Sequence, residues 1–290
     1  MAECNISELT GRGVIKVSGS DAKKFLQDIV TNDVTKSVDG KAVHAGLLTP
    51  QGKILFDFFL IDRGDHFLLE CARDTATDLV KRLTFYKLRA AVQIEDLSGT
   101  LKVLAAWNGV PDAHSQAITY PDPRIEMLGH RIIAPASLDV MAGCDVASEE
   151  DYHHLRIALG VPEADKDYPL GDTFPHEADY DQLHGVDFNK GCYVGQEVVS
   201  RMEHRGKARK RIVPARGRAP LTHGARISAG DAAIGMLGSV AGDMGLAMVR
   251  LDRAEKAIED GHSLMAGDVE IDLIQPGWAD FSVPTKDAVK

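Results

Sequence analysis

The chain has 290 residues and a formal net charge of −10, with 33 Lys and Arg against 43 Asp and Glu. Its composition, 44% hydrophobic and 6% aromatic, excludes collagen-like, coiled-coil and disordered proteins, and the acidic balance argues against general nucleic-acid coating. No apolar run approaches the roughly 20 residues of a membrane span. The opening residues, MAECNISELTGRG, indicate neither a signal nor a transit peptide. We therefore expect a soluble, cytoplasmic monomer with no membrane partner.

The first half of the chain predicts strands punctuated by three helices. Asp21, Thr75 and Ser148 each stand before a predicted helix: apolar residues recur at helical spacing after Asp21, and Thr75-x-x-Asp78 and Ser148-x-x-Asp151 resemble capping boxes. The turn Thr49-Pro50-Gln51-Gly52 predicts a hairpin, because Pro followed two residues later by Gly is a turn signature. Strands are expected at 13–19, 42–49, 53–62, 66–72, 90–97, 101–107 and 131–134.

The second half of the chain has a different pattern of apolar residues and glycines. Residues 161–190 have no sustained period, which is typical of a functional loop or of one ordered by tertiary contacts, and 193–203 can form a helix. From about residue 208, short strand-like runs separated by glycine indicate a small barrel or sandwich. The fold class is therefore strand-rich α+β without βαβ alternation, divided into a region over 1–207, a β-barrel domain over 208–283 and a tail over 284–290.

The four cysteines predict one functional thiol. They form no CxxC pair, which argues against a zinc finger and against a thioredoxin-like redox motif. The cysteine pattern favours a reducing cytosol, in which thiols stay unpaired. Cys71 lies in an apolar run and is expected to be inert. Cys192 follows Lys190 and precedes a predicted helix, and both the cation and the helix would lower its thiol pKa. An inert cysteine in a tight loop is the alternative.

A basic strip follows this cysteine. Residues 190–211 contain seven basic and two acidic residues, on a chain that is otherwise acidic. The strip is either a solvated linker, a site for the anionic polyglutamate tail of folate, or a docking site for RNA or protein. Direct RNA binding is the least favoured, because interleaved aromatic residues for base stacking are absent.

Several motifs resemble the YgfZ-type folate-binding proteins, relatives of the glycine-cleavage T-protein (aminomethyltransferase). The most specific is LHGVDFNKGCYVGQEVVSRM over 183–202, followed by His204-Arg205-Gly206. Further matches are FLQ and TNDV over 25–34, LLTPQGKI over 47–54, LR with GVPE over 155–163, and GLAMVR over 245–250.

This resemblance implies a three-lobed, ring-like T-protein-like fold with a tetrahydrofolate pocket and a C-terminal β-barrel. It places Asp57 and Glu177 at the family's folate-binding acids, where a carboxylate can pair with two pterin N–H groups. Tyr193, Gln196, Arg201 and Arg205 are further cofactor-binding candidates, and solvated or capping acids are the alternative for Asp57 and Glu177. A second family acid is replaced by Phe56, which counts against true aminomethyl transfer.

The branch resemblance implies a folate-binding protein that assists assembly or repair of iron–sulfur enzymes, including enzymes that modify tRNA. Cys192 and Lys190 are the expected reactive pair, and iron–sulfur client proteins are the expected partners. One cysteine cannot hold a cluster alone, because sets of four are the norm, and no stable metal site is expected. The alternatives are a folate-dependent one-carbon transferase using Asp57 and Glu177, and a non-catalytic adaptor using the basic strip.

Overall fold

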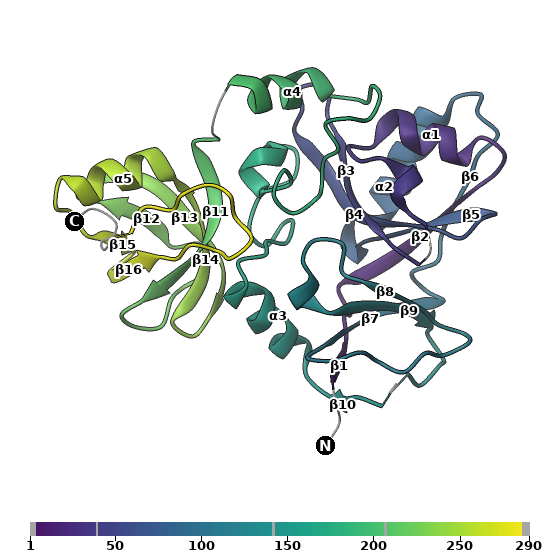
Figure 1. The fold of residues 1–290 in the computed structure, drawn as a ribbon, viewed down its shortest axis with the longest axis horizontal. Coiled ribbons are helices and arrows are strands. Elements are labelled where there is room, and N and C mark those ends of the chain that lie inside the picture. The colour runs from purple at the N-terminus through teal and green to yellow at the C-terminus, as the bar shows by residue number, and fades with distance from the viewer. Residues whose placement is uncertain (1–3, 39, 141–142, 206–207, 286–290) are drawn as a thin grey trace. The chain divides into compact units, whose positions relative to one another are not determined.

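A computed structural model describes residues 4–38, 40–140, 143–205 and 208–285 (Figure 1). The chain forms two compact units: unit 1 comprises Met1–Tyr152 and Leu183–Gln196, and unit 2 comprises His153–Gln182 and Glu197–Lys290. The division at residue 207 expected from the sequence stays a prediction. None of the helices that the structure describes has the length and apolar character needed to cross a bilayer.

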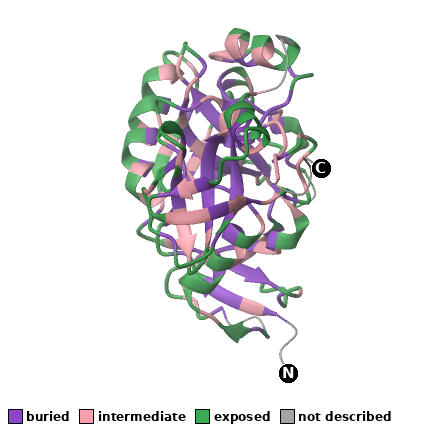
Figure 2. Ribbon diagram, turned by 90° about the vertical axis from the view of Figure 1, so that its left-hand side faces the viewer, coloured by how far each residue is buried: buried purple, intermediate pink, exposed green. Residues whose placement is uncertain are grey.

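The larger sheet of unit 1 carries the predicted hairpin. Its strands are β3 (Val43–Leu48), β4 (Ile54–Asp62), β5 (His66–Ala72), β2 (Arg12–Ser18) and β6 (Gln93–Asp96), in that spatial order and all antiparallel. The helices α1 (Ala22–Ile29) and α2 (Arg73–Lys87) pack on one face, and the short 3-10 helix η1 (Val34–Lys36) follows α1. Figure 2 shows buried residues concentrated on strands and exposed residues on helices and loops.

The alternation of β4 separates a core face from a polar face. Phe56, Phe58 and Leu60 join the apolar core beneath α1 and α2, whereas Asp57 and Phe59 point to the other side because successive strand residues alternate. Phe56, which the resemblance places at a family acid position, therefore faces the core of this chain.

A second sheet completes unit 1. Its spatial order is β10 (Asp145–Val146), β1 (Asn5–Glu8), β7 (Leu101–Trp107), β9 (His130–Pro135) and β8 (Ile118–Pro121), with the 3-10 helix η2 (Glu126–Leu128) before β9. Only β10 with β1 is a parallel pair in this sheet. Cys4 and Cys144, each immediately before its strand (β1 and β10), form a disulfide. The expectation of unpaired thiols is wrong for these two, because their pairing depends on strands 140 residues apart.

Unit 2 contains the expected barrel. The closed barrel has the order β11 (Lys210–Gly217), β14 (Met244–Arg250), β13 (Ala232–Ala241), β12 (Arg226–Ala229), β15 (Leu264–Ala266) and β16 (Val269–Leu273). The helix α5 (Leu251–Glu259) buries Ala254 against its core. The remaining elements are α3 (Glu149–Ala158), the 3-10 helix η3 (Pro175–Ala178) and α4 (Gln196–Arg205).

Two of the three helix starts predicted from the sequence agree with the structure. Asp21 precedes α1, and Ser148 forms the expected reciprocal cap with Asp151 before α3. The helix α2 instead begins at Arg73, and the Thr75 hydroxyl donates back to the Ala72 carbonyl rather than capping the helix. The sequence analysis missed β1, β8, β10 and α5, all of which are short or lie in mixed polar segments.

Candidate functional site

Lys190 holds the loop of the strongest motif against the end of α1. Its ammonium donates to three backbone carbonyls, those of Gln27 at 2.7 Å, Val30 at 2.6 Å and Asn32 at 3.0 Å. The last carbonyls of a helix have no intrahelical partner and carry the negative end of its dipole. Burial lowers the pKa of Lys190 to about 8, so the group is charged at neutral pH. All three ammonium donors are satisfied by these carbonyls.

Thr31 and Asn32 tie the same loop to β3. The Thr31 hydroxyl donates to the Gly185 carbonyl at 2.6 Å and accepts from the Gly46 N–H. The Asn32 side-chain amide donates to the carbonyls of His184 at 2.6 Å and His44 at 2.8 Å. The motifs TNDV and LHGVDFNKGC are therefore two sides of one hydrogen-bonded junction.

Gly195 brings the other end of the loop onto the β3–β4 turn. Its φ of +82° lies in the left-handed region, and an added Cβ would stand 2.6 Å from the Thr49 carbonyl oxygen and 3.0 Å from Gly52 Cα. Only glycine allows this backbone contact. The motif around Cys192 thus packs on the turn of TPQGK, which joins two segments that the sequence analysis selected separately.

Cys192 is exposed within this fixed loop. Tyr193 beside it is buried, and its ring centroid lies 5.2 Å from the Lys190 ammonium. Cys71, by contrast, is buried on β5, where burial raises its pKa to about 12. Cys192 is the exposed free thiol in the described part of the chain.

Asp57 is bonded to a histidine that the sequence analysis did not select. His44 Nε2 lies 2.8 Å from Asp57 Oδ2, and its Nδ1 lies 2.9 Å from the Leu183 carbonyl oxygen. The ring of His44 is buried, and the Asp57 side chain is 15% exposed. The hairpin register pairs Gly46 with Asp57, so His44 is the diagonal neighbour on the same face. That spacing is the signal by which the sequence could have revealed the pair.

The polar face of β4 continues into a buried cluster around Phe59. The guanidinium carbons of Arg12, Arg124 and Arg131 lie 5.7, 5.0 and 5.3 Å from the centroid of the Phe59 ring, within the range of cation–π attraction. All three arginines are buried. This cluster fills the space between the two sheets of unit 1 and serves the fold.

Two buried carboxylates form ion pairs with these three arginines. Glu70 bonds Arg12 and Arg131, each at 3.0 Å, and accepts from the Tyr120 hydroxyl. Asp122 bonds Arg124 at 2.8 Å. Burial alone would raise the pKa of Asp122, yet the neighbouring arginines hold it at about 2. Each of the three arginines therefore contacts a carboxylate, and Glu70 serves two of them. Buried ionic groups require such partners.

The other predicted folate residues have separate surroundings. Glu177 lies in η3 of unit 2, whereas Asp57 belongs to unit 1. One Glu177 carboxylate oxygen accepts from the Phe174 N–H at 3.1 Å, which is a capping contact. Gln196 begins α4 and Arg201 is exposed on it. The side chain of Arg205 and all of Lys207 lie outside the described residues.

The basic strip is not uniform. Arg211, at its end, is buried and donates to Asp181 at 2.5 and 2.7 Å and to Asp179 at 3.3 Å. It therefore stabilises unit 2. Arg209 is exposed and Lys210 partly so.

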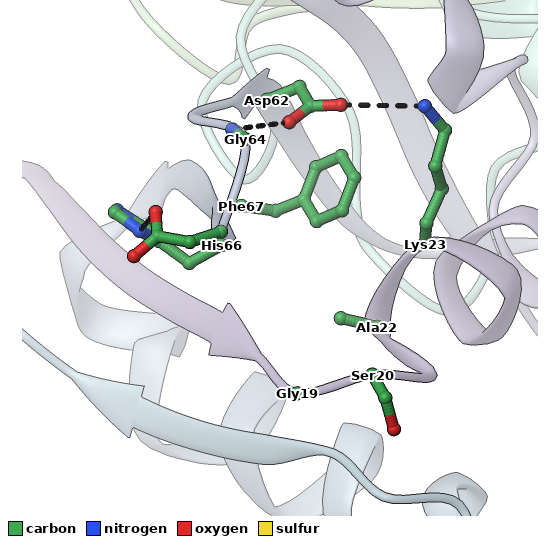
Figure 3. Close-up of a pocket in the computed structure, with 9 residues that line it drawn as sticks. Gly19, Ser20, Ala22, Lys23, Asp62, Gly64, His66 and Phe67 are labelled. Carbon is green, nitrogen blue, oxygen red and sulfur yellow. Dashed lines mark hydrogen bonds and ion pairs between the residues drawn. The ribbon is translucent and has the colours of Figure 1, made fainter.

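Two cavities lie in unit 1. One of about 240 Å³ has Lys41, His44, Pro123 and His184 in its wall. Figure 3 shows the other, of about 600 Å³, where Lys23 at the start of α1 forms an ion pair with Asp62 at 3.6 Å beside Phe67. None of the predicted site residues lines it. Within residues 4–38, 40–140, 143–205 and 208–285, no three His, Cys, Asp or Glu residues are arranged to hold a metal ion.

Two family models match parts of the chain: the GCVT N-terminal domain over residues 2–110 and the CAF17 C-terminal β-barrel domain over 209–281. The crystal structure of the glycine cleavage system aminomethyltransferase T from Bartonella henselae superposes with a TM-score of 0.76. It covers 96% of this chain and 87% of its own, at 16% identity. This likeness confirms the strand-rich α+β, T-protein-like fold with its C-terminal barrel.

Relatives in sequence decide the family. The human iron–sulfur cluster assembly factor IBA57, mitochondrial, is 33% identical, with 83% of this chain and 76% of the relative covered. The mouse protein of that name is 32% identical, with 93% and 84% covered. The chain belongs to the IBA57 family. A Neurospora crassa homolog is 35% identical over 72% of this chain, which spans about half of that relative's length (53%).

The family membership corrects the expected cellular location and limits the expected family assignment to the superfamily. The predicted cytoplasmic location is wrong on this comparison, because these relatives are mitochondrial proteins. The aminomethyltransferase-like superfamily and the CAF17-type barrel are confirmed, whereas the specific YgfZ-type branch is not.

Replacing Gly195 by Ala should loosen the Cys192 loop. The left-handed φ and the approach to Thr49 should together cost about 2–3 kcal/mol of unfolding free energy. Gly191→Ala is the matched control, because nothing lies within 4 Å of its added Cβ, and it should change stability by less than about 1 kcal/mol. Urea unfolding measures both; equal stability of the two variants would contradict the packing of this loop on the turn.

Proposed function

We propose that this protein is an iron–sulfur cluster assembly factor in which Cys192 is the reacting thiol. Its family membership supports the process, since the human and mouse relatives carry that name. The exposure of Cys192 in a loop fixed at both ends supports the residue. The other described cysteines are buried or paired.

The chemistry proposed for Cys192 is coordination of cluster iron. The thiol releases its proton, and the thiolate donates an electron pair to iron without change of oxidation state. The cluster is the cargo, and since one cysteine does not hold a cluster, a client or carrier protein supplies the other ligands. Enzymes that modify tRNA remain within this proposed range of clients.

Lys190 is a positioning residue in this proposal. The sequence analysis expected its cation to activate Cys192, but its three donors are bound to carbonyls at or just after the end of α1. Lys190 therefore acts on the thiol by fixing the backbone two residues before it.

The Cys192→Ser variant should fold normally and fail to support an iron–sulfur client enzyme in cells that lack the native protein. The exposed thiol contributes little to packing, so the melting temperature should stay within a few degrees of wild type. Cys71→Ser is the control for cysteine loss and should retain client activity. Iodoacetamide should label Cys192 at least about 100-fold faster than Cys71, since thiolate and access govern the rate. Full client activity in the Cys192→Ser strain would contradict the assignment.

Tetrahydrofolate binding is the second candidate function. The T-protein-like fold supports it, as does the His44–Asp57 pair, whose histidine lines a cavity of about 240 Å³. In this proposal Asp57 of unit 1 binds the pterin; the contacts of Glu177, Tyr193, Gln196, Arg201 and Arg205 with folate are predictions that rest on the resemblance. The Phe56 side chain in the core disfavours the aminomethyl-transfer alternative.

Calorimetric titration with tetrahydrofolate under anaerobic conditions tests this candidate. Loss of a charge-assisted hydrogen bond in Asp57→Asn or Glu177→Gln should weaken binding at least about tenfold. Asp28→Asn on the exposed face of α1 is the control. Affinity within about twofold of wild type in both site variants would overturn the assignment.

A further inference from the structure

The C-terminal end of α2 displays two large apolar side chains to solvent. Phe85 is 70% exposed and Leu88 is 84% exposed. Leu88 follows the helix with a φ of +45°, a backbone region that a bulky residue rarely adopts. The backbone conformation of Leu88 costs free energy, and its exposed side chain does not offset that cost by burial in the core. Backbone outliers of this kind point to function.

The segment that carries Phe85 and Leu88 is positively charged, whereas the whole chain has a net negative charge. Residues 79–94 contain no acid and four cations, Lys81, Arg82, Lys87 and Arg89, although the chain carries −10 overall. Arg82 and Arg89 are exposed, and neither forms an ion pair with another residue that the structure describes. Lys81 pairs with Asp78 at 2.8 Å, and Lys87 donates to the Val92 carbonyl. Some of this charge offsets the helix dipole, which does not account for Phe85 and Leu88.

Helical spacing gathers some of these groups on one face. Lys81 and Arg82 stand four and three residues before Phe85 on α2, so their side chains lie on the same outer face of the helix as Phe85. Leu88 and Arg89 follow in the turn after the helix ends at Lys87. Leu79 and Leu83 on the inner face are buried in the core. Lys81 and Arg82 therefore border Phe85, and Arg89 is the exposed sequence neighbour of Leu88.

We propose that this end of α2 is a peripheral docking surface for an anionic lipid membrane. Cations beside protruding Phe and Leu side chains are the composition of interfacial membrane anchors, where apolar groups enter the headgroup region and cations meet anionic lipid. Side chains that are 70% and 84% exposed stand out from their surroundings. A fluid bilayer can enclose them without a preformed socket, which a protein partner would need. The proposal departs from the sequence-based expectation of no membrane partner, which rested on the absence of a spanning segment and did not consider peripheral contact.

Vesicle co-sedimentation of the full chain tests this surface. The probes are vesicles of phosphatidylcholine alone and of phosphatidylcholine with about one-third phosphatidylserine, at about 0.05 M and about 0.5 M salt. Binding is expected only with the anionic vesicles and should fall at the higher salt. Phe85→Ala, Leu88→Gly and Arg82→Gln with Arg89→Gln should each reduce the bound-to-free ratio at least about fivefold.

Matched variants keep this test specific. Met127→Ala removes an apolar side chain of the same 70% exposure, and Lys256→Gln removes a cation from α5; neither should change binding. Leu88→Gly should also raise the melting temperature, because glycine relieves the left-handed backbone. No binding of the wild type to anionic vesicles at low salt, or undiminished binding of the Phe85 and arginine variants, would overturn the proposal.

Discussion

The ammonium of Lys190, bound to two carbonyls at the end of α1 and to the Asn32 carbonyl just after it, is the interaction on which the candidate site depends. A buried cation is tolerated only where hydrogen bonds replace its lost water. The unpaired carbonyls of a helix end provide that replacement, and they gain a donor in return. The loop of residues 183–195 is consequently attached to an element more than 150 residues earlier in the chain.

Three further contacts make this attachment a fixed junction. Thr31 and Asn32 bond the carbonyls of Gly185 and His184, and Gly195 packs on the turn between β3 and β4. Between these supports the buried Tyr193 fills the space beside the Lys190 ammonium. Cys192 is left exposed on this junction, which suits the proposed contact of its thiol with a cluster held partly by another protein.

The sequence predicted those parts of the fold that local rules determine. The β3–β4 hairpin follows from Pro50 and Gly52, and the barrel strands follow from regular glycine turns. Local chemistry brought out Cys192 and the resemblance brought out Asp57, but neither gave the reason for Lys190. A Lys two residues before a Cys suggests activation of the thiol, whereas the acceptors that occupy it come from a helix far away in the sequence. The Cys4–Cys144 disulfide and the arginine cluster around Phe59 were missed for the same reason, because each depends on which strands become neighbours.

Amide hydrogen exchange in the Lys190→Met variant is the measurement that tests this junction most directly. If the ammonium holds the two segments together, protection should fall by similar factors in residues 26–34 and 183–195, while the barrel of unit 2 keeps its wild-type exchange. Unchanged protection in both segments, or a loss confined to the immediate neighbours of residue 190, would contradict the account.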